Sequence, residues 1–202
     1  TQVNTGAVAL PTRGAPLTFD DMAGGSLNVV SWLKVTEFGM TIGSDKTNLI
    51  EKINVVIPLS EVALCYSVRY GNPAQYEKTY DRVTNARGGS WADSLMRAQK
   101  IDPKATEYRS ADIPFYVLED IKNKKGEVVV EANKAIGHGL AVTGWNNFAA
   151  LIRKVVAAGG DQGHSIVKLE LGFAPQHNAK GDWGILEFRN PEILQALPWE
   201  VN

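Results

Sequence analysis

The chain has 202 residues, of which 44% are hydrophobic and 21% charged, which is the balance of an ordinary globular protein. Its formal net charge of −1 argues against a strongly basic protein that binds nucleic acid through its overall field, but it leaves room for a local basic groove. The single cysteine, Cys65, excludes an intramolecular disulfide and a cysteine-based zinc site within one chain.

The first 26 residues predict an extended N-terminal leader. Residues 1–26 are rich in Thr, Gly, Pro and Ala and show little periodicity. They lack the basic segment and apolar core that mark a signal peptide, and no apolar run approaches the roughly 18 to 20 residues of a membrane span. We therefore expect a cytoplasmic protein without a membrane partner, in the host cytoplasm if the source is viral.

Three segments with strand character follow the leader. Each is rich in Val, Ile or Leu, and Pro58 ends the second of them. They span residues 27–38, 49–59 and 61–70. Because only short gaps separate these segments, the sequence predicts that they form a meander.

The strand pattern breaks between residues 71 and 112, where the sequence predicts a long insertion. Turns are indicated at Asn72-Pro73 and at Gly88-Gly89. Residues 90–100 have the pattern of a short helix, with Ser90 as its N-cap. Long insertions in compact domains are disproportionately binding elements, so this insertion is the first candidate for a site.

Strand character returns after the insertion. Residues 113–121 are expected to form a strand that pairs with residues 128–132 across a lysine-rich turn, and residues 137–144 form another short strand. Two alternating segments near the end of the chain, 164–173 and 182–189, predict a hairpin.

The clearest helix is predicted at about residues 145–158, where apolar side chains recur at helical spacing. Thr143 is a plausible N-cap, and Gly159 is expected to stop the helix. The last segment, residues 191–202, is partly apolar and is expected to dock on the domain as a C-terminal tail.

Together these elements predict a mainly β protein of the α+β class, with a single domain over residues 27–190. A late amphipathic helix suits a single antiparallel sheet that closes into an OB-like barrel or curls strongly, with the helix plugging one end. A β-sandwich fits less well, because the helix is long and strongly amphipathic.

The sequence carries no recognisable motif for catalysis or metal binding. No two of its three histidines stand at a metal-binding spacing such as i, i+4, and nucleotide-loop and nucleophile-elbow patterns are absent. We expect neither a cofactor nor a metal ion. His138, which lies between two glycines, is the one candidate for catalysis, and a histidine at a strand edge or turn is the simpler interpretation.

Aromatic and basic residues alternate in the insertion, a combination that suits single-stranded nucleic acid. Basic side chains follow the phosphates, and aromatic rings stack on the bases. Between Arg69 and Arg109, eight basic residues stand against five acidic ones, so the local charge is 8 − 5 = +3. The candidate binding residues are Arg69, Tyr70, Tyr76, Lys78, Tyr80, Arg82, Arg87, Trp91 and Arg109, with Lys122, Lys124 and Lys125 in the later turn. Lys34, Lys52 and Lys168 lie within strands and would extend this basic track if they share a face.

A packing role is the competing interpretation for the aromatic residues. Tyr76 and Tyr80 are four residues apart, so residues 74–83 could form a surface helix whose two tyrosines pack inward. Trp91 could simply anchor the helix that it opens, and a lysine-rich hairpin tip is usually only a solvated turn. The sequence leaves open which way Tyr76 and Tyr80 point.

The segments INVVIPLSEVALCYSVRYG, RSADIPFYVLEDI and SIVKLELGFAPQHNAKGDWGILEFR, with the polar insertion after the first and the helix before the last, have a recognisable order. Over residues 27–190, this layout resembles that of phage-type single-stranded DNA-binding proteins with a decorated OB-fold. The resemblance implies a role in replication or recombination. Replication-type members usually end in an acidic tail that recruits partner enzymes, whereas the only acidic residue of LPWEVN here is Glu200.

Three functions follow as alternatives from the sequence. The leading one is a non-catalytic, sequence-tolerant binder of single-stranded nucleic acid, with DNA favoured over RNA. The second is a protein–protein interaction module, such as a virion, assembly or host-directed factor, for which a homo-oligomer would be a natural state. The third is an enzyme of unknown type, in which His138 is the first residue to replace.

Overall fold

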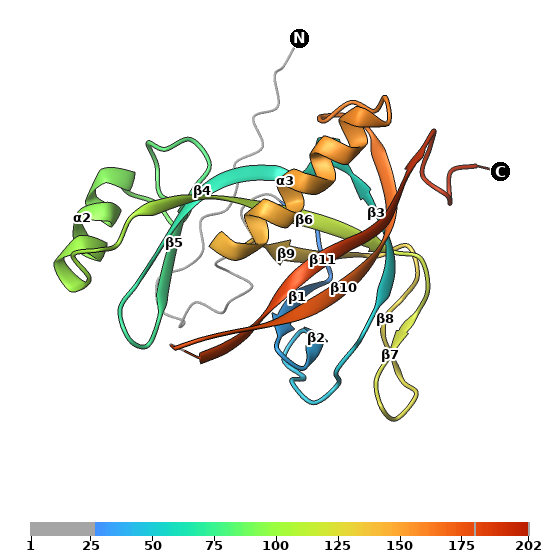
Figure 1. Ribbon diagram of the computed structural model, residues 1–202, viewed down its shortest axis with the longest axis horizontal. Coiled ribbons are helices and arrows are strands. Elements are labelled where there is room, and N and C mark those ends of the chain that lie inside the picture. Colours follow the sequence, from blue (N-terminus) through green and yellow to red (C-terminus); the bar gives the residue numbers. More distant parts are fainter. Residues whose placement is uncertain (1–26, 180, 202) are drawn as a thin grey trace, which may run out of the picture.

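The computed structural model describes residues 27–179 and 181–201 of the chain (Figure 1). The predicted leader, residues 1–26, lies outside the described residues. Strands dominate the described part, and two α-helices accompany them, which confirms the predicted mainly β, α+β class.

Most strands belong to one large sheet, and two form a separate small hairpin. The sheet contains β1 (Ser31–Thr36), β2 (Gly39–Ile42), β3 (Ile53–Pro58), β4 (Ala63–Tyr70), β5 (Gln75–Thr79), β6 (Glu107–Val117), β9 (Ala135–Gly139), β10 (Ile166–Asn178) and β11 (Gly181–Leu194). The hairpin contains β7 (Ile121–Lys122) and β8 (Val128–Val130). The α-helices are α2 (Trp91–Ile101) and α3 (Val142–Ala157), and a short 3-10 helix, η1 (Leu59–Glu61), separates β3 from β4.

Strand β6 is the centre of the large sheet. It pairs with β9, and it also pairs with β4 along its first half and with β3 near its end. The sheet continues from β3 through β10 to β11, and from β9 through β1 to β2. The predicted meander is therefore wrong, because β3 and β4 each pair with β6 rather than with the strand that precedes them.

The sheet is open and mixed, which corrects the predicted antiparallel, OB-like barrel. Strands β1 and β9 run parallel, whereas the other described pairs are antiparallel. Among the described residues, β2 and β11 end the sheet without pairing with each other. The alternation of apolar residues indicates strands, but it does not fix their partners or directions. The sequence pattern therefore does not distinguish an open, mixed sheet from an antiparallel barrel.

The main core lies between the sheet and α3, which crosses one face of the sheet in Figure 1. The Phe148 and Phe188 rings pack with centroids 5.9 Å apart, and Asn147 Nδ2 donates to Leu186 O at 3.0 Å. The helix starts at Val142, before the predicted residue 145. Its N-cap is Ala141, which makes no side-chain capping bond. The predicted cap, Thr143, therefore lies inside the first turn.

Within the predicted insertion, β5, residues 80–90 and α2 form a folded extension that we call the arm, whereas residues 107–112 belong to β6 of the large sheet. The arm packs on β4 around a second, smaller apolar cluster, whose buried members are Val68, Tyr70, Trp91, Ala98 and Ala105. Ser90 Oγ accepts from Asp93 N, which confirms the predicted N-cap of α2. Residues 75–79 are strand, so the alternative of a surface helix over residues 74–83 is wrong.

Candidate functional site

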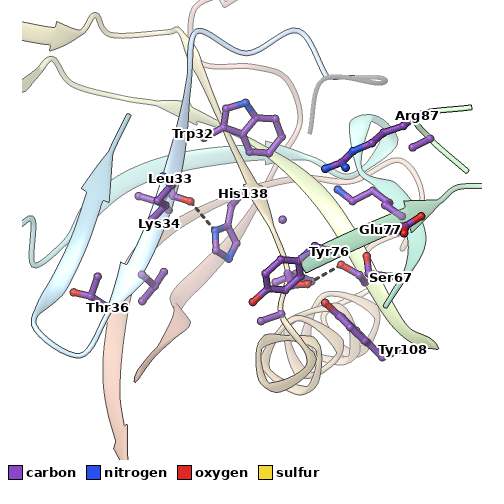
Figure 2. Close-up of a pocket in the computed structure, with 17 residues that line it drawn as sticks. Trp32, Leu33, Lys34, Thr36, Ser67, Tyr76, Glu77, Arg87, Tyr108 and His138 are labelled. Atoms are coloured by element: carbon purple, nitrogen blue, oxygen red, sulfur yellow. Dashed lines mark hydrogen bonds between the residues drawn. The ribbon is translucent and has the colours of Figure 1, made fainter. Parts of the chain in front are cut away.

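A cleft of about 430 Å³ lies between β1 and the arm (Figure 2). Residues 32–36 of β1 form one side, and β5 with Arg87 forms the other. Parts of β4, β6 and β9 and the residues that follow β9 complete the lining. The lining residues with polar or aromatic side chains are Trp32, Lys34, Thr36, Ser67, Tyr76, Glu77, Lys78, Arg87, Tyr108, Ser110 and His138.

The cleft exists because the parallel ladder between β1 and β9 is very short. Only Ser31 and Trp32 of β1 have ladder partners in β9, namely Ile136 and Gly137. One residue further along, the Leu33 carbonyl accepts from the side chain of His138 instead of from the backbone of β9. The end of the ladder leaves the space that the lining residues surround.

Trp32 closes the cleft at the start of this space. Its indole lies so close to Gly137 that a Cβ atom there would sit 2.8 Å from the ring. Because a side chain at residue 137 would collide with the ring, glycine is required for this packing. Trp32 is buried and therefore offers little free aromatic face.

Arg87 enters the cleft from a tight loop, residues 85–89. Asn85 N donates to Gly89 O at 2.9 Å, and Gly88 and Gly89 both adopt positive φ, at 95° and 85°, which suits glycine. The buried Asn85 side chain donates to Ser94 Oγ at 2.8 Å and ties the loop to α2. The glycine pair therefore closes a fixed loop. Among the described residues, no carboxylate forms an ion pair with Arg87.

Lys78 is fixed in the cleft by a buried carboxylate. Its Nζ lies 2.5 Å from Asp112 Oδ1, and the Tyr80 hydroxyl donates to the other oxygen, Oδ2, at 2.7 Å. Asp112 is fully buried. Because an ammonium group has three N–H donors and Asp112 receives one, Lys78 can direct the others at a ligand.

His138 presents a hydrogen-bond acceptor to the cleft, because a contact with the backbone defines the tautomer of its ring. Its Nδ1 lies 3.0 Å from Leu33 O, and since a carbonyl only accepts, Nδ1 carries the proton and Nε2 holds a lone pair. Burial lowers the pKa of His138, and the Leu33 bond and Asp112 oppose this only in part, so the ring is neutral at physiological pH. Phe115 stacks beside the ring with centroids 6.3 Å apart.

Tyr76 presents the most accessible aromatic side chain of the cleft. Its exposed fraction is 40%, and its hydroxyl accepts from Arg69 Nε at 3.1 Å. The Arg69 guanidinium lies 6.0 Å from the centre of the same ring. Tyr108 is half-buried in the lining, and burial raises its pKa to about 12, so its hydroxyl keeps its proton at neutral pH.

The structure brings Tyr76, Lys78 and Arg87 together in the cleft, with Arg69 beside Tyr76. Two other predicted site residues, Tyr70 of β4 and Trp91 of α2, are buried in the small apolar cluster between β4 and the arm. The Tyr70 hydroxyl donates to Glu77 Oε1 at 2.6 Å, and Trp91 Nε1 donates to Glu107 Oε2 at 2.9 Å. These two rings hold the arm to β4 and β6 and present no face for stacking.

The remaining predicted site residues of the insertion lie outside the cleft lining. Tyr80 is held by Asp112, and Arg82 forms an ion pair with Glu107. Arg109 is exposed on β6 between two residues that do line the cleft. Residues that are close together in the sequence therefore point to different sides of the structure, and only some of them reach the cleft.

The three hairpin lysines, Lys122, Lys124 and Lys125, lie in the β7–β8 hairpin, and α2 lies at the opposite end of the molecule in Figure 1. None of them lines the cleft. Of the three lysines predicted to lie within strands, only Lys34 lines the cleft. Lys52 precedes β3 and its Nζ lies 3.8 Å from Glu170, and Lys168 of β10 lies 3.6 Å from Glu192. The described structure thus contains no continuous basic track from the arm to the hairpin.

Sequence reasoning missed most of the lining from β1, β4 and β6, including Trp32, Ser67 and Ser110. For His138 the sequence indicated a histidine at a strand edge or turn, or else a catalytic residue, and no role in binding. Within β1, only Lys34 could have been recognised as a binding residue from the sequence, because it is a cation in the middle of an apolar strand. The other residues reach the cleft through strand pairing, which local patterns do not report.

The described residues hold no group of three or more His, Cys, Asp or Glu side chains that could bind a metal ion. Neither α2 nor α3 is long and apolar enough to cross a membrane. Comparison of the chain with models of protein families, with curated proteins and with solved structures finds no match.

Proposed function

We propose that the protein binds single-stranded nucleic acid in the cleft and does so without catalysis. Tyr76 stacks on a base, while Lys34, Lys78 and Arg87 contact the phosphate backbone. The observation that carries this proposal is the meeting of an accessible aromatic side chain with three cations in one cleft. These are the two components that single strands need from a protein.

The charges around the cleft favour a polyanionic ligand. Glu77 is the one carboxylate in the lining, and it already forms an ion pair with Arg97 at 2.9 Å. Asp112 offsets the charge of Lys78, whereas no carboxylate among the described residues forms an ion pair with Arg87, so Arg87 attracts phosphate more strongly than Lys78 does. A positive cleft in a chain with a net charge of −1 directs the ligand to one place on the molecule.

The size of the cleft favours a flexible strand over a duplex. Its volume of about 430 Å³ falls in the range of roughly 300–1,000 Å³ that is typical of small-molecule sites. A space of this size takes a unit such as one nucleotide, whereas the bases of a duplex stay stacked inside the helix. The rest of a strand would then pass along the rim of the cleft, beside Arg69.

Anisotropy titration of a fluorescent dT oligonucleotide with the full chain tests this function. We expect binding at low salt that weakens steeply as salt rises, because the protein releases counterions from the phosphates. Tyr76→Leu should weaken binding roughly 5- to 150-fold, the equivalent of one lost stacking contact. Arg87→Ala should weaken binding and flatten its dependence on salt.

The matched control is Lys125→Ala, which removes an equal charge from the hairpin outside the cleft. Its affinity should stay within about twofold of the wild type, because an exposed charge outside the site contributes little. Equal losses for Arg87→Ala and Lys125→Ala would place binding outside the cleft, and no binding at low salt would refute the function.

A further inference from the structure

His138 holds a neutral hydrogen-bond acceptor in a fixed position within a cleft whose charged side chains are mostly cations. Its Nδ1 is bound to β1 through Leu33 O, so Nε2, on the other side of the imidazole, points away from that strand. Figure 2 shows the ring between β1 and Tyr76. No described residue forms a hydrogen bond with Nε2, and the ring belongs to the cleft lining.

A fixed acceptor selects for a donor on the ligand. The three cations of the lining, Lys34, Lys78 and Arg87, carry only N–H donors, so none of them can accept a hydrogen bond from a ligand. Phosphate oxygens are acceptors as well, and His138 would repel them through its lone pair. The partner that suits Nε2 is therefore an N–H group of a base, next to the ring that Tyr76 stacks on.

We propose that His138 Nε2 accepts a hydrogen bond from the Watson–Crick edge of an unpaired base, which makes His138 the residue that distinguishes single from paired strands. This inference rests on the proposed function and adds a contact to it. Each natural base carries at least one N–H donor on that edge, so the contact tolerates any sequence. In a duplex, the same donor is engaged by the opposite strand.

The test compares two labelled single strands, oligo-dT and the same oligonucleotide methylated at N3 of every thymine. Both keep the phosphates and the stacking face, but the methylated one has lost its N3–H donor. We expect the wild type to bind oligo-dT roughly 2- to 12-fold more tightly, the range for one net hydrogen bond.

Two variants separate the hydrogen bond from the bulk of the methyl group. His138→Phe keeps a flat ring beside Phe115 but has no acceptor, so it should bind both oligonucleotides equally, at about the wild-type affinity for the methylated one. His138→Gln can donate its amide N–H to Leu33 O and present its oxygen to the base, so it should retain the preference. This second variant keeps the test valid if His138→Phe fails to fold.

The outcomes distinguish this inference from the function beneath it. If the wild type binds both oligonucleotides with equal affinity, the inference is wrong while single-strand binding stands. A preference that persists in His138→Phe would likewise overturn it, because the acceptor would then lie elsewhere. If neither oligonucleotide binds, the proposed function is refuted and this inference with it.

Discussion

At the scale of single residues, the cleft is notable for polar side chains that are already held before any ligand arrives. Asp112 binds Lys78 and Tyr80 with its two oxygens, and the Leu33 carbonyl fixes the ring of His138. Side chains that are fixed in advance lose less conformational entropy on binding. This preorganisation is what we would expect of a binding site rather than of a connecting loop.

Replacement of Asp112 by Asn should destabilise the protein. The change leaves Lys78, whose side chain is largely buried, without its counter-charge, and breaking such a pair costs roughly 3 kcal/mol of unfolding free energy. Urea denaturation followed by circular dichroism measures this loss. Glu119→Gln, at an exposed position, is the control and should change stability by less than about 0.5 kcal/mol. Equal stability of the two variants would show that Asp112 does not hold Lys78 in solution.

At the scale of elements, the predicted insertion is a folded arm with its own small core. Trp91 has only 2% of its surface exposed, and its Nε1 donates to Glu107 of β6. A buried network, in which Glu77 accepts from both Tyr70 and Asn85, joins β4, β5 and the loop before α2. The arm therefore supports Arg87 and Tyr76 as a rigid frame, and the aromatic residues inside it serve packing.

Loss of the Trp91 ring should open the arm while leaving the main core folded. Trp91→Ala removes a large buried side chain, which typically costs about 3–5 kcal/mol. Because the arm has its own apolar cluster, we expect this loss to appear as rapid tryptic cleavage at Arg97, Lys100 or Lys104, with the rest of the chain resistant. Trp91→Phe keeps most of the packing and should be cleaved at nearly the wild-type rate. Global unfolding of Trp91→Ala would contradict a separate arm.

At the scale of the whole molecule, the cleft is a consequence of the open, mixed sheet. The parallel β1–β9 ladder ends after two residue pairs, and β4 carries the arm across from this gap. In a closed antiparallel barrel the ladder would continue and fill the space. The architecture that the sequence did not predict is therefore the one that creates the candidate site.

The features that could be predicted from the sequence are those set by neighbours along the chain. Ser90 caps α2 as expected, because a capping bond spans only a few residues, and helical spacing located α3 to within a turn. Strand order could not be predicted, because the pairing of both β3 and β4 with β6 depends on contacts between residues far apart.

Only the part of the candidate site that comes from one continuous segment could be predicted from the sequence. Tyr76, Lys78 and Arg87 belong to a single stretch that is dense in rings and cations, so composition pointed to them. Composition could not separate Tyr76 from Trp91, because it does not report which side of a strand or helix faces the core. His138 acquires its role in the cleft from Leu33, 105 residues away, through a contact that no local pattern records.

The central claim is that single-stranded nucleic acid binds in the cleft between β1 and the arm. Hydrogen–deuterium exchange of the full chain, with and without saturating oligo-dT at low salt, tests this claim most directly. We predict slower exchange in β1, β5, residues 85–89 and β9, with no change in the β7–β8 hairpin. Protection confined to the hairpin, or the absence of protection anywhere, would contradict the claim.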